Sequence, residues 1–296
     1  EGQYAINGNG LAALNGNYTF AQAPANTTAL TVTQPVNFTW TAAGGGAWES
    51  GSNWNKGFAP VDGAVVTIPD LGPVGPSATI TYSSATTNVK TLTSFEGLAI
   101  AGGNLNLGTG GADVSTFQGG APLTLTGGML GINSGAALSV SNLILNGGTL
   151  RGTGSINGNV SNLAGTVAAG NSVGTMTING NYAQGPAGTL GVEVGGTNQY
   201  DVLYVTGNVT LDGTLAVTLV NNFVPALNET YTVIQSGGAV SGSLGVTSIL
   251  PAPVFRANSL PSSLNLIVGA SAVVPLATLV DGGQVRGNHG APAAHG

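Results

Sequence analysis

Apolar and polar residues alternate over most of this chain, and glycine turns interrupt the alternation at short intervals. Six segments share one pattern, in which a glycine turn is followed by an apolar residue and further alternation. Their apolar residues follow one another at steps of 17 to 25 residues and lie at Leu105, Leu130, Leu150, Val167, Leu190 and Leu215. A repeat of this length is typical of a β-solenoid, in which successive coils contribute short strands to one shared core.

The strands of such coils are short, and several can be read from the alternation alone. They include 65–68, 123–125, 143–145 and 176–178, where β-branched and other apolar residues dominate. Each coil buries its apolar face only by stacking on its neighbours. Because stacked strands lie about 4.8 Å apart, about eight coils would form a rod about 40 Å long. The pattern therefore predicts an all-β solenoid.

Composition divides the chain into four segments. Residues 1–38 alternate like strands, 39–63 contain all three tryptophans, and 64–250 carry the repeats. Residues 251–296 contain one or two further strands and a tail rich in glycine and alanine. We therefore expect an N-terminal strand segment, a tryptophan-rich cap, a β-solenoid and C-terminal strands, in that order.

Residues 164–250 resemble the C-terminal passenger region of bacterial autotransporter-type proteins. The resemblance is carried by AGNSVGTMTINGNY, then DVLYVTG, then the strand YTVI. It implies a right-handed parallel β-helix and an extracellular home at the bacterial cell surface. That family continues into a membrane β-barrel of many tilted strands. The stretch after Leu250 is too short for such a barrel, so we expect only the passenger part here.

Two shorter resemblances point to bacterial surface proteins as well. Residues 14–34 are similar to the closing strands of small all-β modules that recur in large bacterial adhesins. The three tryptophans, followed by Pro60 and Asp62-Gly63, resemble the opening of autotransporter-type passengers. The first resemblance implies an incomplete module whose strands lack partners.

An unpaired strand edge either needs a cover or accepts a strand from another molecule. We expect such contact strands within 28–36 and 264–280. The candidate contact residues are Thr28, Leu30, Val32, Leu264, Leu266 and Val268. Packing of the N-terminal strands against the solenoid is the alternative to pairing between copies.

Charge is scarce along the whole chain. Charged residues make up 5% of it, against about 25% in an ordinary soluble domain. The 11 acidic and 5 basic residues give a net charge of −6, and no basic stripe is present. Nucleic-acid binding is therefore not expected, because it depends on neutralising phosphates. Weak mutual repulsion also permits copies of the chain to associate.

The tryptophans have two interpretations. A row of aromatic rings can bind sugars by stacking, which would make Trp48 and Trp54 candidate glycan-binding residues. The same rings can instead close the open end of the solenoid, where the first coil would otherwise expose its core. The cluster directly precedes the first repeats, and this position favours the cap.

Residues suited to catalysis are few. Glu193 and Asp201 are expected on consecutive coils, and paired carboxylates are what glycoside hydrolysis uses. The favoured interpretation is that Asp201 caps a turn while Glu193 faces solvent. Arg151 is the only basic residue between 91 and 250, which is poor provision for an enzyme acting on acidic sugars. His289 and His295 lie in the tail and are expected to be solvated, so we predict no metal and no cofactor.

The remaining signals concern location. The chain has no cysteine, and the apolar run 270–280 is interrupted and too short to span a bilayer. It begins without an apolar leader, and we expect that a signal segment has been removed or lies outside this sequence. We therefore expect a secreted, non-enzymatic structural protein that assembles into, or forms part of, a bacterial surface fibre or matrix. The alternatives are an adhesin or glycan-binding module and, third, a polysaccharide-active enzyme.

Overall fold

The computed structural model describes residues 36–72, 76–248 and 254–269 with their side chains, and the backbone of three N-terminal strands. Those strands are β1 (Gly2–Ala5), β2 (Thr19–Gln22) and β3 (Ala29–Thr33). They form an antiparallel sheet in the order β1-β3-β2. The central strand β3 is therefore paired on both of its edges.

This pairing corrects one expected contact strand. Leu30 is paired with Tyr4 of β1 on one side and with Gln22 of β2 on the other. Val32 has the same two neighbouring strands, so the backbone of β3 offers no free edge to another molecule. Thr28 lies outside the described residues.

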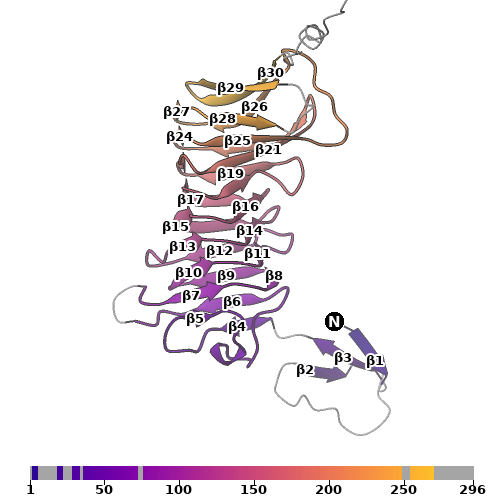
Figure 1. Cartoon of the computed structure of the whole chain (residues 1–296). Coiled ribbons are helices and arrows are strands. Elements are labelled where there is room, and N and C mark those ends of the chain that lie inside the picture. Colours follow the sequence, from indigo (N-terminus) through magenta and orange to yellow (C-terminus); the bar gives the residue numbers. More distant parts are fainter. Residues whose placement is uncertain are drawn as a thin grey trace, which may run out of the picture.

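The rest of the described chain winds into a stack of coils (Figure 1). A full coil contributes strands to three parallel ladders, which we call faces one, two and three. Faces one and two belong to a single 18-stranded sheet, because β15 (Ala137–Leu145) and β17 (Ser155–Asn162) each run through both. Face three is a separate 9-stranded sheet.

Each face is built from one strand in most coils. Besides the first parts of β15 and β17, face one comprises β4 (Asn37–Thr39), β6 (Val65–Ile68), β9 (Thr91–Ser94), β12 (Val114–Phe117), β19 (Thr175–Asn179), β23 (Val202–Val205) and β26 (Thr230–Ser236). Besides their second parts, face two comprises β5 (Gly46–Ala47), β7 (Thr79–Tyr82), β10 (Gly97–Ile100), β13 (Leu123–Leu125), β20 (Tyr182–Gln184), β24 (Val209–Leu211) and β27 (Val240–Gly242).

Face three carries the candidate site. Its stacked strands are β8 (Thr86–Val89), β11 (Asn104–Leu107), β14 (Met129–Ile132), β16 (Thr149–Gly152), β18 (Thr166–Ala168), β21 (Thr189–Gly196), β25 (Thr214–Leu219) and β28 (Gly245–Ser248). The short β22 (Gln199–Tyr200) pairs antiparallel with β21 beside this stack.

The predicted β-solenoid is confirmed, down to its register. Strand pairing aligns Leu105 with Leu130, Leu130 with Leu150, and so on through Val167, Leu190 and Leu215. All six side chains are fully buried. The steps between them vary because loops of different length join the strands, while the position facing the core stays in column. The architecture is all-β, built from parallel sheets, as expected of a parallel β-helix.

The N-terminal end of the core is closed by aromatic rings. Trp40, Trp48 and Trp54 are buried, and Trp54 meets the other two edge to face at centroid distances of 5.1 and 4.8 Å. The Trp54 indole N–H donates to the Trp48 carbonyl at 2.6 Å. Trp48 also contacts Tyr82 of β7, which ties the cluster to the next coil. A short 3₁₀ turn at Gly51–Asn53 carries the chain around it.

The C-terminal end is covered by a hairpin of β29 (Val254–Leu260) and β30 (Ser263–Gly269). β30 lies between β29 and β26 and pairs antiparallel with both. Leu264, Leu266 and Val268 are buried in the core. The expectation that they form an unpaired contact strand is therefore wrong, because their side chains complete the solenoid and their backbone is paired on both sides. Residues 270–280 lie outside the described part.

Strand pairing begins earlier than the repeats suggest. β4, at the boundary of the expected N-terminal segment, pairs with β6, and β5, within the expected cap, pairs with β7. Both therefore already contribute strands to the solenoid. Within the described residues, no helix has the length and apolar character needed to cross a bilayer.

Candidate functional site

In the described part of the chain, clefts open on face three and at its border, and they follow one another along the rod. The two near the N-terminal end have volumes of about 520 and 430 Å³ and share Asp62. The third has a volume of about 230 Å³ and lies over β16, β18, β21 and β25. These clefts mark face three as the surface on which to look for a site.

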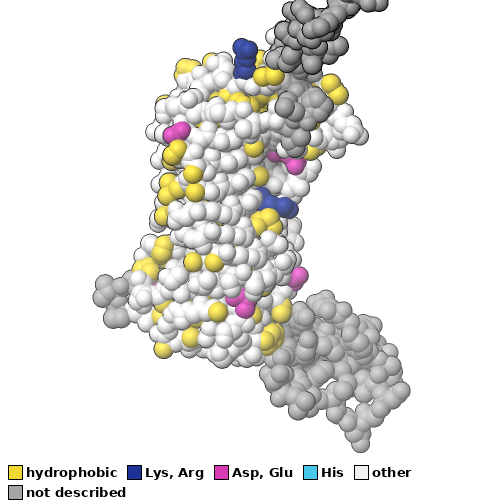
Figure 2. Space-filling view, viewed as in Figure 1, with side chains coloured by type: hydrophobic (Ala, Val, Ile, Leu, Met, Phe, Trp, Pro, Cys, Tyr) yellow, Lys and Arg dark blue, Asp and Glu magenta, His cyan; other side chains and the backbone are white. Residues whose placement is uncertain are grey.

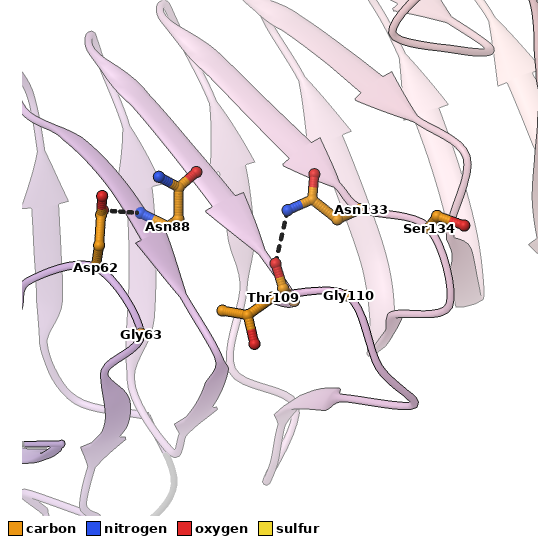
Figure 3. Close-up of a pocket in the computed structure, with 8 residues that line it drawn as sticks. Asp62, Gly63, Asn88, Thr109, Gly110, Asn133 and Ser134 are labelled. Carbon is orange, nitrogen blue, oxygen red and sulfur yellow. Dashed lines mark hydrogen bonds between the residues drawn. The ribbon is translucent and has the colours of Figure 1, made fainter.

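In the 520 Å³ cleft, several of the polar groups are engaged by the protein itself. Asp62 Oδ1 accepts the backbone N–H of Asn88 at 2.8 Å, and Asn133 Nδ2 donates to the carbonyl of Gly108 at 2.6 Å (Figure 3). Asp113 accepts both the backbone N–H and the hydroxyl of Thr109 at its rim. These contacts hold the turns between coils, so the cleft is best explained as the gap between successive turns.

The same half of face three carries an amide ladder. Asn88 and Asn106 occupy register-equivalent outward positions, and Asn106 Nδ2 donates to Asn88 Oδ1 at 2.9 Å. The next position in this column is Gly131. A Cβ there would lie 2.1 Å from Asn106 Oδ1, so glycine is required for the Asn106 amide to lie across the strand.

The C-terminal half continues this column with different residues. Strand pairing aligns Gly131 with Arg151, then Ala168, Gly191 and Ala216. Ala168, Gly191 and Ala216 form the floor of the 230 Å³ cleft. Its walls are hydroxyl, amide and carboxylate groups, and the lining residues that supply them are Thr149, Asn171, Ser172, Glu193, Asp201 and Thr218.

Arg151 lies at one end of this cleft, on β16. Its Nε donates to Asn171 Oδ1 at 2.7 Å. Among the described residues, no other hydrogen bond or ion pair of this guanidinium is found, so both Nη groups are directed to no protein acceptor. The contact with Asn171 holds the planar fork in place, and a held fork suits a carboxylate or another planar anion.

Glu193 and Asp201 lie close together, and the contact between them is made through the backbone, with Asp201 holding turn N–H groups as in the favoured interpretation. The β21–β22 hairpin brings them together, with the Asp201 N–H donating to the Glu193 carbonyl and the Glu193 N–H donating to Asp201 Oδ2, both at 2.9 Å. Asp201 Oδ1 accepts the N–H of Gly174 at 2.8 Å. Asp201 therefore anchors the loop before β19 to the hairpin.

Opposing effects act on the pKa of the Asp201 carboxyl. Burial raises the pKa of the Asp201 carboxyl to about 6, the N–H groups of Glu193 and Gly174 oppose the rise, and the nearby Glu193 charge adds to it. An acid of this pKa could exchange a proton near neutrality. Both of its oxygens, however, hold backbone N–H groups, which favours the structural role of Asp201 over general acid catalysis.

The other sequence-based candidates lie elsewhere. Trp48 and Trp54 are inside the N-terminal cap, so neither presents a ring face on which a sugar could stack, and their glycan-binding interpretation is corrected. His289 and His295 lie outside the described residues. In the part of the chain that the structure describes, no group of three or more His, Cys, Asp and Glu is placed to hold a metal ion.

One buried carboxylate was missed by the sequence analysis. Glu96 is fully buried and accepts the backbone N–H groups of Leu71, Ser77 and Ala78 at 2.7–2.8 Å. It fixes the ends of the loop that leads into β7. No sequence pattern distinguishes it from the other scattered acids, because its donors come from a loop 18 to 25 residues away.

Comparison with known proteins does not identify this site. No protein-family model matches the chain, and no curated protein matches it.

Proposed function

We propose that this chain is a non-enzymatic structural module, an autotransporter-type passenger rod that forms part of a bacterial surface fibre or matrix. The observation that supports this most directly is the continuous core. One column of six fully buried residues passes through successive coils, with aromatic rings closing one end and a β-hairpin covering the other. A stack of this kind resists local opening, because each coil is held by its neighbours.

The surface supports the same proposal. Its outward positions are mostly Thr, Ser, Asn and Gly, and charged side chains are sparse over the face shown in Figure 2. Such a surface imposes little repulsion between parallel rods. Copies therefore associate side by side through these faces. The strands originally expected to join them do not take part, since β3 and β30 are paired internally.

Sedimentation velocity and electron microscopy of the full chain test the two parts of this proposal separately. We expect an elongated particle whose sedimentation coefficient rises with protein concentration, and laterally associated rods in the images. A compact particle would contradict the rod. An elongated particle that stays monomeric from micromolar to millimolar concentration would contradict association and leave only a stalk.

A further inference from the structure

We propose that the cleft over β16, β18, β21 and β25 binds an acidic glycan through Arg151, with the sugar chain lying along the rod over Ala168, Gly191 and Ala216. The ligand class is a short hydroxyl-rich saccharide that ends in a single carboxylate-bearing sugar. This inference goes beyond the structural role proposed above and is independent of whether the rods associate.

A glycine lies at the centre of the floor of this cleft. Gly191 lies within β21 and has no left-handed backbone angle, so its conformation does not require glycine. A Cβ built there would meet its nearest neighbours, the Thr166 and Ala168 side chains, at 3.7 and 3.8 Å, which is ordinary contact. Glycine inside a strand weakens it and often marks a close approach by a ligand. Neither packing nor backbone geometry explains this glycine, whereas an open trough does.

A cation lies at the end of that trough. Arg151 is held by Asn171 through Nε and directs its remaining donors to no protein acceptor in the described part of the chain. Glu193, a partly exposed carboxylate of the cleft, lies on β21, two coils farther along than Arg151 on β16. The Asp201 carboxylate is already held by the N–H groups of Glu193 and Gly174. Two coils correspond to about 10 Å along the axis. A ligand with one anionic end therefore meets the cation and keeps its neutral part near the carboxylates.

The lining of the cleft distinguishes a saccharide from a peptide. Extended peptides gain affinity by adding a strand to a free sheet edge. Here β18 is paired with β16 and β21, and β21 is paired with β18 and β25, so the floor has no free backbone edge. The walls instead offer the hydroxyls of Thr149, Ser172 and Thr218. These groups both donate and accept, which matches the hydroxyls of a sugar.

The size of the cleft sets the length of the ligand. Its volume of about 230 Å³ is below the range of about 300–1,000 Å³ that is usual for drug-sized ligands. It therefore holds one or two sugar rings, and a longer chain would extend out of it along the face. Cellobiouronic acid, a disaccharide with one glucuronate, is a suitable probe, and cellobiose is its neutral counterpart.

Calorimetry and saturation-transfer NMR on the folded full chain at low ionic strength test the proposal. We expect cellobiouronic acid to bind at least tenfold more tightly than cellobiose. Arg151→Gln should abolish that preference, and Gly191→Leu, which fills the trough, should abolish binding of both. Arg256→Gln removes an exposed arginine on β29, and Thr210→Leu adds bulk on face two, so these matched controls should bind like the native chain.

Four outcomes would overturn the proposal. They are no binding of cellobiouronic acid at millimolar concentration, equal binding of both disaccharides, equal losses in the Arg256→Gln control, and binding of an Asp-Asp dipeptide as tight as that of the acidic sugar. Circular dichroism of Gly191→Leu and Arg151→Gln confirms that any loss comes from a folded protein. None of these outcomes depends on sedimentation behaviour, so failure here leaves the proposed rod untouched.

Discussion

The N-terminal and C-terminal halves of face three share one backbone arrangement and present different surfaces. In the first half, Asn106 lies across Gly131 and bonds to Asn88, so the outward column is filled by the protein's own amides. In the second half, the same column passes through Ala168 and Gly191, which line the 230 Å³ cleft and are partly exposed. Behind both surfaces the core residues Leu130 and Leu190 are equally buried.

This difference shows where a solenoid can vary. Every inward position has a coil on both sides, so its size and polarity are constrained by close packing. Outward positions meet only the residues above and below them on the surface. The function of one face can therefore change along the rod without changing the fold. Likewise, two glycines in the same column can be present for different physical reasons.

The largest predicted effect tests the shared core. Leu130→Ala and Leu190→Ala should each lower the free energy of unfolding by about 2–5 kcal/mol, because each leaves a cavity that the stacked coils fill poorly. Urea unfolding monitored by circular dichroism measures both. If one substitution were nearly neutral, the core behind the two halves of face three would not be equally well packed. That result would contradict the claim that the two halves differ only on their outer surface.

The next effect concerns Asp201, which is found only in the second half. Asp201→Asn places an N–H₂ group against a backbone donor and should cost about 1–3 kcal/mol. Thermal melting of both proteins measures the difference. Asn258→Asp, at an exposed position of β29, is a control for changing a single charge and should be much less disruptive.

The difference in stability between the native chain and Asp201→Asn should change with pH in a definite direction. The pKa of Asp201 is raised to about 6, above the value of about 3.9 expected in an unfolded chain. The folded protein therefore binds more protons between these values, and its stability falls as pH rises from about 4 to about 6. The advantage of the native chain over Asp201→Asn should narrow across this interval. A constant or widening gap would show that the N–H groups of Glu193 and Gly174 outweigh burial.

A smaller effect separates the two glycines. Gly131→Ala should destabilise by about 1 kcal/mol, since it displaces the Asn106 amide and breaks its bond to Asn88. In an Asn106→Ala background the same change should be harmless or stabilising. If Gly131→Ala were as costly in that background, the strain would come from the backbone and not from the amide.

The smallest effect has the opposite sign. Gly191→Ala should stabilise the chain by about 0.4–1 kcal/mol, because the native backbone accepts alanine and the unfolded chain loses freedom. Differential scanning calorimetry of the single variant would detect the rise in melting temperature. A clear destabilisation would mean that Gly191 is needed for packing, and the main argument for an open trough would be lost.

Much of the fold could be predicted because its signal is local. The alternation of 65–68, 123–125 and 176–178 appears as β6, β13 and β19, and the six repeated apolar positions are partners in successive coils. The role of Asp201 in holding a turn follows from its place between two strand patterns, whereas the β21–β22 hairpin that brings Glu193 to it does not. The aromatic cluster could be placed at the end of the rod from its position before the first repeats.

The candidate site could be predicted only in part. Arg151 was noticed as an isolated charge, but the sequence offers no reason to place it beside Asn171, 20 residues later, or at the head of a trough. The position of Trp48 and Trp54 before the first repeats favours a cap over a sugar site, but only their burial excludes the sugar site. The prediction of unpaired contact strands was wrong because a strand edge is free only when no other strand lies beside it. The strands that pair with β3 and β30 include β1 and β26, which lie far from them in the sequence.

The sequence by itself determined the repeated strand, the side of each strand that faces the core, and the low charge of the surface, because alternation and composition act residue by residue. The tertiary structure alone decided which strands are left unpaired, which glycine serves packing, and which outward residues lie in one column. These properties depend on loop lengths that shift the register between coils, and a register is set only when all the coils are stacked.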